Sequence, residues 1–166
     1  MGIKEHKKNA PGKIKIGIIT VSSTRTVKSD KSGAWIKKCA EKEGYMVVSH
    51  DVIPDESSII TKTVLDIIRN KKPGAVLVTG GTGISDKDVT IEAVHPLFIK
   101  KLPGFGAVFA QLSYEQIDSA AILSRATAGI VNKTVVFCMP GSLAACKLAC
   151  KALIFPEIGH IAGHII

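Results

Sequence analysis

The chain has 166 residues, 46% of them hydrophobic, and a formal net charge of +8, which predicts a single domain large enough to bury a core. No apolar run reaches the roughly 18 residues of a membrane span. The polar, lysine-rich start lacks the apolar core of a signal peptide, so we expect a cytoplasmic protein with no membrane partner. The charge suits anionic ligands, but aromatic residues are only 5% and we expect no nucleic-acid partner, because single strands are bound where basic and aromatic residues interleave.

The start of the chain differs from the rest in composition. Residues 1–12 are polar and end in Pro11-Gly12, which predicts a flexible basic arm before a single domain over residues 13–166. The four cysteines include no Cys-x-x-Cys pair, so neither a zinc site nor a redox motif is indicated. The spacing of Cys146 and Cys150 favours buried, reduced thiols on one helix face.

The first predicted strand, Ile14 to Val21, is β-branched and almost uninterrupted, which is typical of a strand buried on both faces. Residues 22–26 follow it, with four hydroxyl side chains around Arg25. An arginine among hydroxyls suits a phosphate, and an ordinary Ser/Thr turn explains these residues equally well. Asp30 then opens a helix that runs to Glu43 and ends at a glycine.

The second predicted strand runs from Tyr45 to Ile53. Asp55 follows its end and precedes a helix predicted over Ser57 to Asn70. Ser57 or Ser58 can cap that helix, which leaves Asp55 for another role.

The central predicted strand, Val76 to Val78, breaks into Thr79-Gly80-Gly81-Thr82-Gly83. Glycines there permit positive φ and let a ligand approach backbone N–H groups. The acids Asp86, Asp88 and Glu92 then lead into a helix start. A strand, a glycine loop and acids at a helix start suit a phosphate with its Mg²⁺.

The same stretch has a plainer interpretation, in which Asp88 is only the N-cap of the following helix. It also fails two familiar templates. No Gly-Lys-Ser/Thr ends it, so it is not a Walker A loop, and Asp86 stands where the dinucleotide-binding motif requires glycine. The spacing alone favours phosphate binding.

The second half of the chain continues the alternation of strands and helices. Residues 103–106 predict a glycine turn before a helix over Ala107 to Ile117. Gly129 and Asn132 predict a turn between strands. Arg125 has two interpretations: it pairs with an acid, or it faces a bound anion.

Near the end, Thr134 to Met139 predicts a buried strand, and Pro140-Gly141-Ser142 starts a helix over Leu143 to Leu153. Free N–H groups at that start suit an anion, and Ser142 as an N-cap is compatible with this. The tail from Pro156 to Ile166 predicts an apolar docking helix or an oligomer contact. Its two histidines at i, i+4 have no third zinc ligand near in sequence.

The alternation of strands and helices predicts an α/β fold with three layers, α/β/α, around a mostly parallel sheet. The carboxyl ends of parallel strands meet at one edge. The polar segments at residues 22–25, 55 and 79–88 are therefore expected to converge there.

Several motifs resemble the MoaB/MogA family of molybdenum cofactor biosynthesis proteins, and the resemblance covers roughly Lys13 to Phe155. It implies a Rossmann-like, molybdopterin-binding fold. It also implies a nucleotidyltransferase, molybdopterin adenylyltransferase, that uses Mg²⁺ and takes ATP and molybdopterin to adenylylated molybdopterin and pyrophosphate. The motifs are Gly80-Gly81-Thr82-Gly83, Asp88-Val89-Thr90, Glu92-Ala93, Pro103-Gly104-Phe105-Gly106, Ser113-Tyr114-Glu115, Leu123-Ser124-Arg125-Ala126 and Pro140-Gly141-Ser142.

The resemblance places the two functional aspartates of the family at Asp55 and Asp88, which are also the implied Mg²⁺ ligands. Two positions depart from the family pattern. Leu143-Ala144-Ala145 stands where many members place a proline and a lysine, and Ser22-Ser23 where relatives often have Ser-Asp. The implied substrate- and nucleotide-binding residues are Gly80, Gly81, Thr82, Gly83, Ser22, Ser23, Arg25, Asp30, Ser32, Pro140, Gly141 and Ser142.

Two other functions remain open from the sequence. One is a catalytically silent molybdopterin-binding or assembly protein of the same family, and the other is a nucleic-acid-binding module that uses the basic arm. The family also implies a homo-oligomer, a trimer or hexamer, in which we expect Ile158, Ile161 and Ile165 to be buried between copies.

Overall fold

The described part of the chain is residues 14–165, given by a computed structural model. The predicted arm over residues 1–12 lies outside the described residues. Within residues 14–165 no helix has the length and apolar character needed to cross a membrane.

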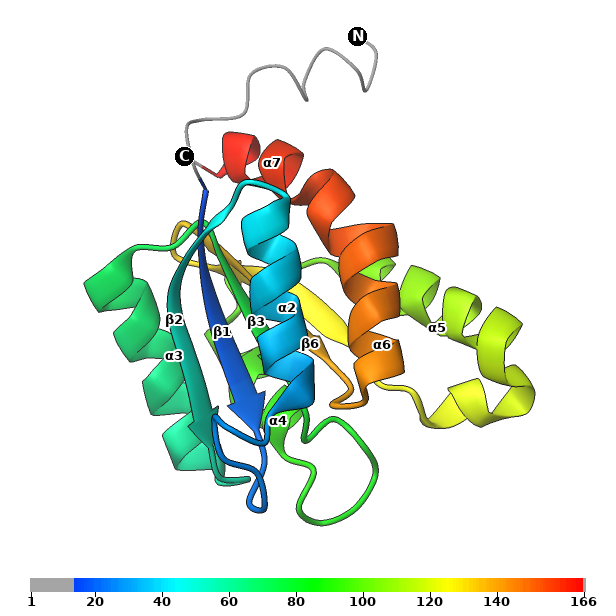
Figure 1. Cartoon of the computed structure of the whole chain (residues 1–166). Helices are drawn as coiled ribbons and strands as arrows, with labels where there is room; N and C mark the ends of the chain where they lie inside the picture. Colours follow the sequence, from blue (N-terminus) through cyan, green and yellow to red (C-terminus); the bar gives the residue numbers. More distant parts are fainter. Residues whose placement is uncertain (1–13, 166) are drawn as a thin grey trace, which may run out of the picture.

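A six-stranded sheet runs through the middle of these residues (Figure 1). Its strands are β1 (Lys15–Val21), β2 (Met46–Ile53), β3 (Ala75–Thr79), β4 (Lys100–Lys101), β5 (Thr127–Val131) and β6 (Thr134–Met139). They lie in the order β2-β1-β3-β6-β5-β4. The first four in this order are parallel, whereas β5 is antiparallel to both its neighbours. The prediction of a mostly parallel sheet is confirmed.

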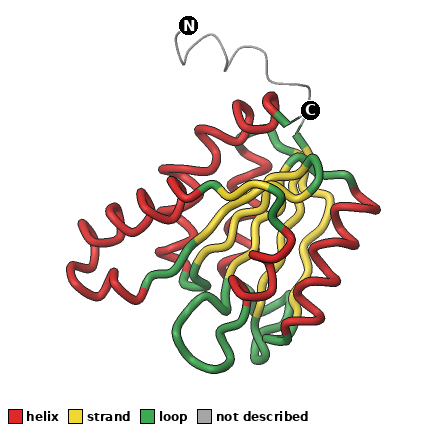
Figure 2. Tube along the Cα trace, turned by 180° about the vertical axis from the view of Figure 1, so that it is seen from behind, coloured by secondary structure: helices red, strands yellow, loops and turns green. Residues whose placement is uncertain are grey.

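Helices cover both faces of the sheet, so the predicted three layers are confirmed. One face carries α2 (Lys31–Lys42) and a continuous run of α6 (Leu143–Leu148), the π-helical segment η4 (Ala149–Ile154) and α7 (Phe155–His164) (Figure 1). The other face carries α3 (Ser57–Lys71), α4 (Thr90–Val94) and η2 (His95–Leu97) (Figure 2). Both figures show α5 (Pro103–Ile117) and η3 (Asp118–Leu123) standing out at one end.

β1 shows why this sequence becomes a central strand. Ile16 and Ile18 pack into the core under α2, α6 and α7. Ile19 and Val21 pack into the second core, under α3. All four side chains are almost fully buried, and an apolar residue at nearly every position is what a strand covered on both faces requires.

The helix boundaries follow capping chemistry in part. Asp30 caps α2 by accepting the N–H of Gly33, as predicted. α3, in contrast, begins after Glu56 with no side-chain cap, so the predicted cap at Ser57 or Ser58 is wrong. Burial of Ile60 and Val64 stabilises this helix instead, because packing of an apolar face outweighs capping.

α5 begins earlier than the sequence predicts. Residues 103–106 form its first turn, so the predicted glycine turn is wrong. Pro103 fits the first helical position because its missing N–H needs no partner there. Phe105 then holds this turn against the core, with its ring centroid 5.0 Å from that of Phe137 and 6.3 Å from that of Phe109.

The predicted turn between strands lies at Asn132, which adopts a φ of 53°. Gly129, expected in the same turn, lies inside β5 instead. A side chain there would overlap the ring of Phe98, so glycine is required by a close approach and not by a turn.

The C-terminal segment confirms the docking-helix interpretation. Ile158 is fully buried and Ala162 nearly so, both in the chain's own core. Ile161 and Ile165 pack partly buried against the same core. The prediction that a second copy buries these isoleucines is therefore wrong for Ile158, because the sheet of the same chain already covers it.

The cysteines are unpaired, as predicted. Cys138, Cys146 and Cys150 are buried, and Cys39 is partly exposed. Burial raises the pKa of Cys138 to about 12, so this thiol stays protonated and inert at neutral pH.

Candidate functional site

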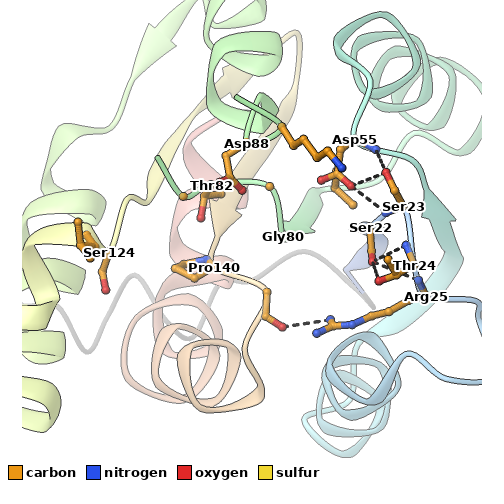
Figure 3. A pocket seen from close by; sticks show the side chains of 16 residues that line it. Ser22, Ser23, Thr24, Arg25, Asp55, Gly80, Thr82, Asp88, Ser124 and Pro140 are labelled. Carbon is orange, nitrogen blue, oxygen red and sulfur yellow. Dashed lines mark hydrogen bonds between the residues drawn. The ribbon is translucent and has the colours of Figure 1, made fainter. Parts of the chain in front are cut away.

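A pocket of about 420 Å³ opens at the carboxyl edge of the sheet (Figure 3). Parallel α/β sheets bind ligands at this edge. The predicted convergence is confirmed, because all three polar segments contribute to one lining. The lining residues are Val21, Ser22, Ser23, Thr24, Arg25, Asp55, Gly80, Gly81, Thr82, Gly83, Lys87, Asp88, Leu123, Ser124, Pro140 and Gly141.

The glycine loop, residues 79–83, directs its carbonyl oxygens to donors of the protein. The Gly80 carbonyl accepts from Thr90 Oγ1 at 2.8 Å, and the Gly81 carbonyl accepts from the Thr90 N–H at 2.9 Å. The Thr82 carbonyl accepts from Arg125 Nε at 2.9 Å. The partial negative charge of each oxygen is thus offset before any ligand binds.

The N–H groups of the same loop are differently placed. Within residues 14–165, neither Gly81 nor Thr82 donates its N–H to a protein acceptor. Gly80 and Gly81 adopt φ values of 96° and 63°, and a side chain on Gly81 would overlap the Thr90 hydroxyl. The loop therefore requires these glycines, and it offers N–H groups suited to an anion.

The proline turn, residues 140–142, forms the facing wall and is held in the same manner. Thr79 Oγ1 donates to the Pro140 carbonyl at 3.0 Å. The Gly141 carbonyl accepts two hydrogen bonds, from Ser32 Oγ at 2.9 Å and from Arg25 Nη1 at 3.2 Å. Figure 3 shows Arg25 reaching across to this turn.

The last residue of the proline turn starts α6. Ser142 Oγ accepts from the Ala145 N–H at 3.2 Å, so the predicted N-cap is confirmed. The two walls also touch, because a Cβ added to Gly141 would lie 3.1 Å from the Gly80 Cα. The pocket floor is therefore backbone packed against backbone.

Two carboxylates face the pocket. Asp55 Oδ2 accepts from the N–H and the Oγ of Ser23, both at 2.7 Å. Asp88 Oδ2 accepts from the N–H of Ser85 at 3.0 Å and from its Oγ at 2.6 Å. Each serine thus donates both of its hydrogen bonds to Oδ2 of the carboxylate.

Asp88 does not cap α4. The N-cap position is Val89, and no side chain accepts a hydrogen bond there, so the N-cap interpretation is wrong. The hydrogen bond from the Ser85 hydroxyl lowers the pKa of Asp88 and outweighs the opposing effect of burial. The Ser85 and Gly83 N–H groups and the Arg125 charge lower this pKa further, so the carboxylate is ionised at neutral pH.

These two carboxylates fit a magnesium ion that is held partly by its substrate. Mg²⁺ usually takes one or two carboxylates and completes its shell with water and phosphate oxygens. Within residues 14–165, no group of three or more His, Cys, Asp or Glu side chains could hold a metal. Asp55 and Asp88 are the two carboxylates of the lining that would hold such an ion.

The charges of the lining cancel. Arg25 and Lys87 are its cations, and Asp55 and Asp88 are its anions. A bound polyphosphate therefore needs the N–H groups of the walls, and an added cation, to balance its charge.

Most of the predicted site residues line the pocket, but three do not. Asp30 and Ser32 are buried behind the proline turn, at 1% and 2% exposure. Ser142 also lies outside the lining. The lining residues that were not named among the predicted site residues are Val21, Thr24, Lys87, Leu123 and Ser124. Lys87 lies in the polar segment 79–88 that was expected at this edge, and Leu123 and Ser124 belong to the family motif at residues 123–126. Leu123 is the last residue of η3, and Ser124 follows it.

The acid-pair interpretation of Arg125 is confirmed. Its Nη2 lies 2.7 Å from Glu92 Oε1, and its Nε bonds the Thr82 carbonyl. Arg125 is not among the lining residues. It therefore acts on the pocket through the backbone of Thr82.

Comparison with known proteins decides the family. A sequence model described as "Probable molybdopterin binding domain" matches residues 17–160. The chain belongs to this family. Molybdenum cofactor biosynthesis protein B of Bacillus subtilis (strain 168) is 48% identical over 166 residues, covering 99% of this chain and 98% of that protein. The predicted resemblance to MoaB/MogA proteins is confirmed.

Solved structures agree with the family. A crystal structure of a molybdenum cofactor biosynthesis protein B superposes with a TM-score of 0.90 at 43% identity, covering 94% of this chain and 98% of that one. The tungsten cofactor synthesizing protein MoaB from Pyrococcus furiosus superposes with a TM-score of 0.84 at 38% identity, covering 93% and 98%. The chain is thus a MoaB/MogA-type protein of molybdenum cofactor biosynthesis.

Proposed function

We propose that this protein is a molybdopterin adenylyltransferase, which transfers the AMP moiety of Mg-ATP to the terminal phosphate of molybdopterin. One observation supports this most. Five carbonyl oxygens of the two pocket walls each accept a hydrogen bond from the protein, those of Gly80, Gly81, Thr82, Pro140 and Gly141. Walls whose carbonyl acceptors are already engaged suit a polyanion when N–H groups, here those of Gly81 and Thr82, have no protein acceptor within residues 14–165.

The proposed reaction forms a bond between a terminal phosphate oxygen of molybdopterin and the α-phosphorus of ATP. The bond that breaks joins the α-phosphorus to the bridging oxygen, and pyrophosphate leaves with the electron pair. The second pKa of a phosphate monoester is about 6, so the attacking oxygen is mostly deprotonated at neutral pH. No general base is needed, which agrees with a lining that contains no histidine.

The pocket residues then have to align two polyanions and offset their charge. Arg25 and Lys87 supply positive side chains. In this proposal Lys87 replaces the lysine that many family members carry after the proline turn, where this chain has Leu143-Ala144-Ala145. Mg²⁺, when bound with ATP beside Asp55 and Asp88, offsets further phosphate charge.

The direct test incubates the purified chain with molybdopterin and Mg-ATP and measures pyrophosphate together with the mass of the pterin product. We expect pyrophosphate and adenylylated molybdopterin in equal amounts. Pterin and ATP binding without pyrophosphate would favour the catalytically silent alternative. Failure of the chain to bind ATP at all would contradict the proposal.

We also propose that the chain forms a homo-oligomer through α5 and η3. α5 buries only Phe109 and Ser113 in its own chain, and apolar side chains remain exposed along both elements. Such a surface is typical of protein–protein contacts. The exposed residues are Val108, Tyr114, Ile117, Ile122 and Leu123.

Light scattering at micromolar concentration tests this assembly. We expect a mass of at least two chains for the wild type, and the mass of one chain for an Ile117→Asp/Ile122→Asp variant. Ile84→Asp is the matched control, because Ile84 is also exposed but lies outside α5 and η3. A wild-type mass of one chain would contradict the proposal.

A further inference from the structure

A buried group of polar side chains lies behind the proline turn, outside the pocket. At its centre the Asp30 side chain has no solvent exposure. Asp30 Oδ2 accepts from Thr20 Oγ1 at 2.6 Å and contacts His50 Nε2 at 2.9 Å, and Oδ1 accepts the Gly33 N–H at 2.9 Å. None of these four residues lines the pocket.

The hydrogen bonds to Asp30 determine its ionisation and the position of the proton on His50. Burial alone would raise the pKa of Asp30, but the hydrogen bonds from Thr20, Gly33 and His50 outweigh it and the pKa is lowered. An ionised carboxylate only accepts hydrogen bonds. His50 therefore carries its proton on Nε2 and donates it to Asp30, from a ring that is only 11% exposed.

The group fixes the first turn of α2. Asp30 is the N-cap of this helix. His50 comes from β2, and its Cα pairs with that of Ile18 of β1. A side chain on Gly33 would overlap the Asp30 carboxylate, the His50 ring and the Thr20 hydroxyl. The turn is thus packed directly on the histidine, and it cannot shift without breaking that contact.

The same turn contacts the pocket wall. Ser32, at 2% exposure, donates its hydroxyl to the Gly141 carbonyl at 2.9 Å. A trans peptide holds the carbonyl of one residue antiparallel to the N–H of the next. Holding the Gly141 carbonyl toward Ser32 therefore also fixes the direction of the Ser142 N–H.

We propose that His50 is a positioning residue of the pocket, which acts through Asp30 and Ser32 on the peptide between Gly141 and Ser142. The proposal rests on the proposed function, since it assumes that this wall receives phosphate. His50 itself touches no substrate. Without its hydrogen bond, the first turn of α2 loosens and Ser32 releases the Gly141 carbonyl, which then keeps only the hydrogen bond from Arg25 Nη1 at 3.2 Å. The peptide between Gly141 and Ser142 is then held less firmly in the orientation that presents the Ser142 N–H to an anion.

A purely structural role predicts something different. In that case, removing His50 lowers the melting temperature and leaves affinity for polyphosphate unchanged. The two roles are separated by binding measurements on folded variants, by rescue with a side chain that keeps the donor, and by a double-mutant cycle with Ser32.

The experiment titrates pyrophosphate, and separately Mg-ATP, into wild type and variants by calorimetry. His50→Leu removes the donor, and we expect affinity to fall about 5- to 10-fold, the scale of one ordinary hydrogen bond, because the effect reaches the pocket through Asp30 and Ser32. His50→Gln places an amide N–H where Nε2 was, and we expect binding within about twofold of wild type. Ser32→Ala alone lowers affinity, and adding His50→Leu to it lowers affinity by less than about twofold more.

Ile36→Val is the matched control, because Ile36 is a fully buried residue of the same helix. We expect it to lower the melting temperature and leave affinity unchanged. If His50→Leu does not fold, His50→Asn, whose amide is too short to reach Asp30, replaces it.

The outcomes separate the two proposals. Wild-type protein that binds neither pyrophosphate nor Mg-ATP overturns the proposed function, and this inference with it. Wild-type binding with equal affinity in the donor-lacking variants overturns the role of His50 alone. Fully additive losses from His50 and Ser32 overturn the route through Ser32.

Discussion

Two strand-to-helix turns face each other across the pocket, and they differ in length and charge. The turn after β3 runs from Gly80 to Val89 and carries Lys87 and Asp88. The turn after β6 is residues 140–142 and carries no charge. Both have their carbonyls held by the protein. Under the proposed function, the long turn provides charged groups for chemistry, and the short turn provides a fixed backbone for binding.

The largest expected effect is the loss of activity when a pocket carboxylate is removed, either Asp88 of the long turn or Asp55. Replacing Asp88 or Asp55 with Asn keeps shape and removes charge. We expect adenylylation to fall on the order of 10²-fold, the scale of one key electrostatic contact, with little change in melting temperature. Asp86→Asn is the control, because Asp86 is exposed and outside the lining. Near-wild-type turnover in both Asn variants would remove the carboxylates from the mechanism.

The two turns should also differ in their tolerance of a methyl group. Gly80 has a φ of 96°, and a Cβ there would overlap the Val21 carbonyl. We expect Gly80→Ala to lower the free energy of unfolding by about 2–3 kcal/mol. The nearest atom to a Cβ on Gly141 is the Gly80 Cα at 3.1 Å, and we expect Gly141→Ala to lower the free energy of unfolding by less than about 1 kcal/mol. Urea unfolding measures the free energy of unfolding of both variants. Equal losses would contradict the expected difference between the two turns.

A smaller effect on ATP binding is expected when Arg125, which donates to the Thr82 carbonyl of the long turn, is replaced. Arg125→Gln removes the hydrogen bond to the Thr82 carbonyl together with the ion pair to Glu92. We expect the KM for ATP to rise about fivefold, on the scale of one lost hydrogen bond. Glu92→Gln breaks only the exposed ion pair, which contributes little, and is expected to leave KM unchanged. Equal rises in both variants would assign the effect to the ion pair.

The smallest effect concerns pH. Hydrogen bonds from Ser85 lower the pKa of Asp88 below its ordinary value of 3.8. The stability that they contribute is therefore present above that value and is lost as pH falls through the lower folded pKa. We expect wild type and Asp88→Asn to differ slightly in melting temperature at about pH 6, and we expect the difference to shrink as pH is lowered below 3.8. A melting-temperature difference that grows as pH falls would contradict a lowered pKa for Asp88.

The sheet and the location of the pocket could be predicted because the sequence patterns that indicate them are long or occur several times. β1 has the apolar pattern of a strand buried on both faces, and it is buried from its second residue, Ile16, to Val21. The polar segments that follow β1, β2 and β3 meet at one edge as a consequence of parallel topology alone. No side-chain contact had to be known for that step.

Predictions from short motifs were wrong where the same motif is compatible with two local structures. Pro103-Gly104 suits a turn as well as a helix start, and only the packing of Phe105 in the core decides for the helix. Asp88 before a helix suits a cap, but its carboxylate bonds Ser85 instead. In both cases the deciding contact is absent from the local sequence.

Contacts between distant segments could not be predicted either. Ser124 reaches the pocket because α5 and η3 carry it there. His50 meets Asp30 because β2 pairs with β1 in a register that sets His50 beside Ile18. That register shifts between Ile16 and Gly17, and a hydrophobicity pattern does not reveal such a shift.

The short segment η3 belongs to two surfaces at once. Leu123 lines the pocket, and its neighbour Ile122 is 87% exposed on the apolar surface with α5. A ligand in the pocket and a second copy on the apolar surface would both contact η3. If one of them orders η3, the other loses less conformational entropy when it binds. Thermodynamic linkage makes this reciprocal. If a neighbouring copy raises affinity in the pocket by some factor, ligand in the pocket tightens the assembly by the same factor, and measured mass would then depend on substrate concentration.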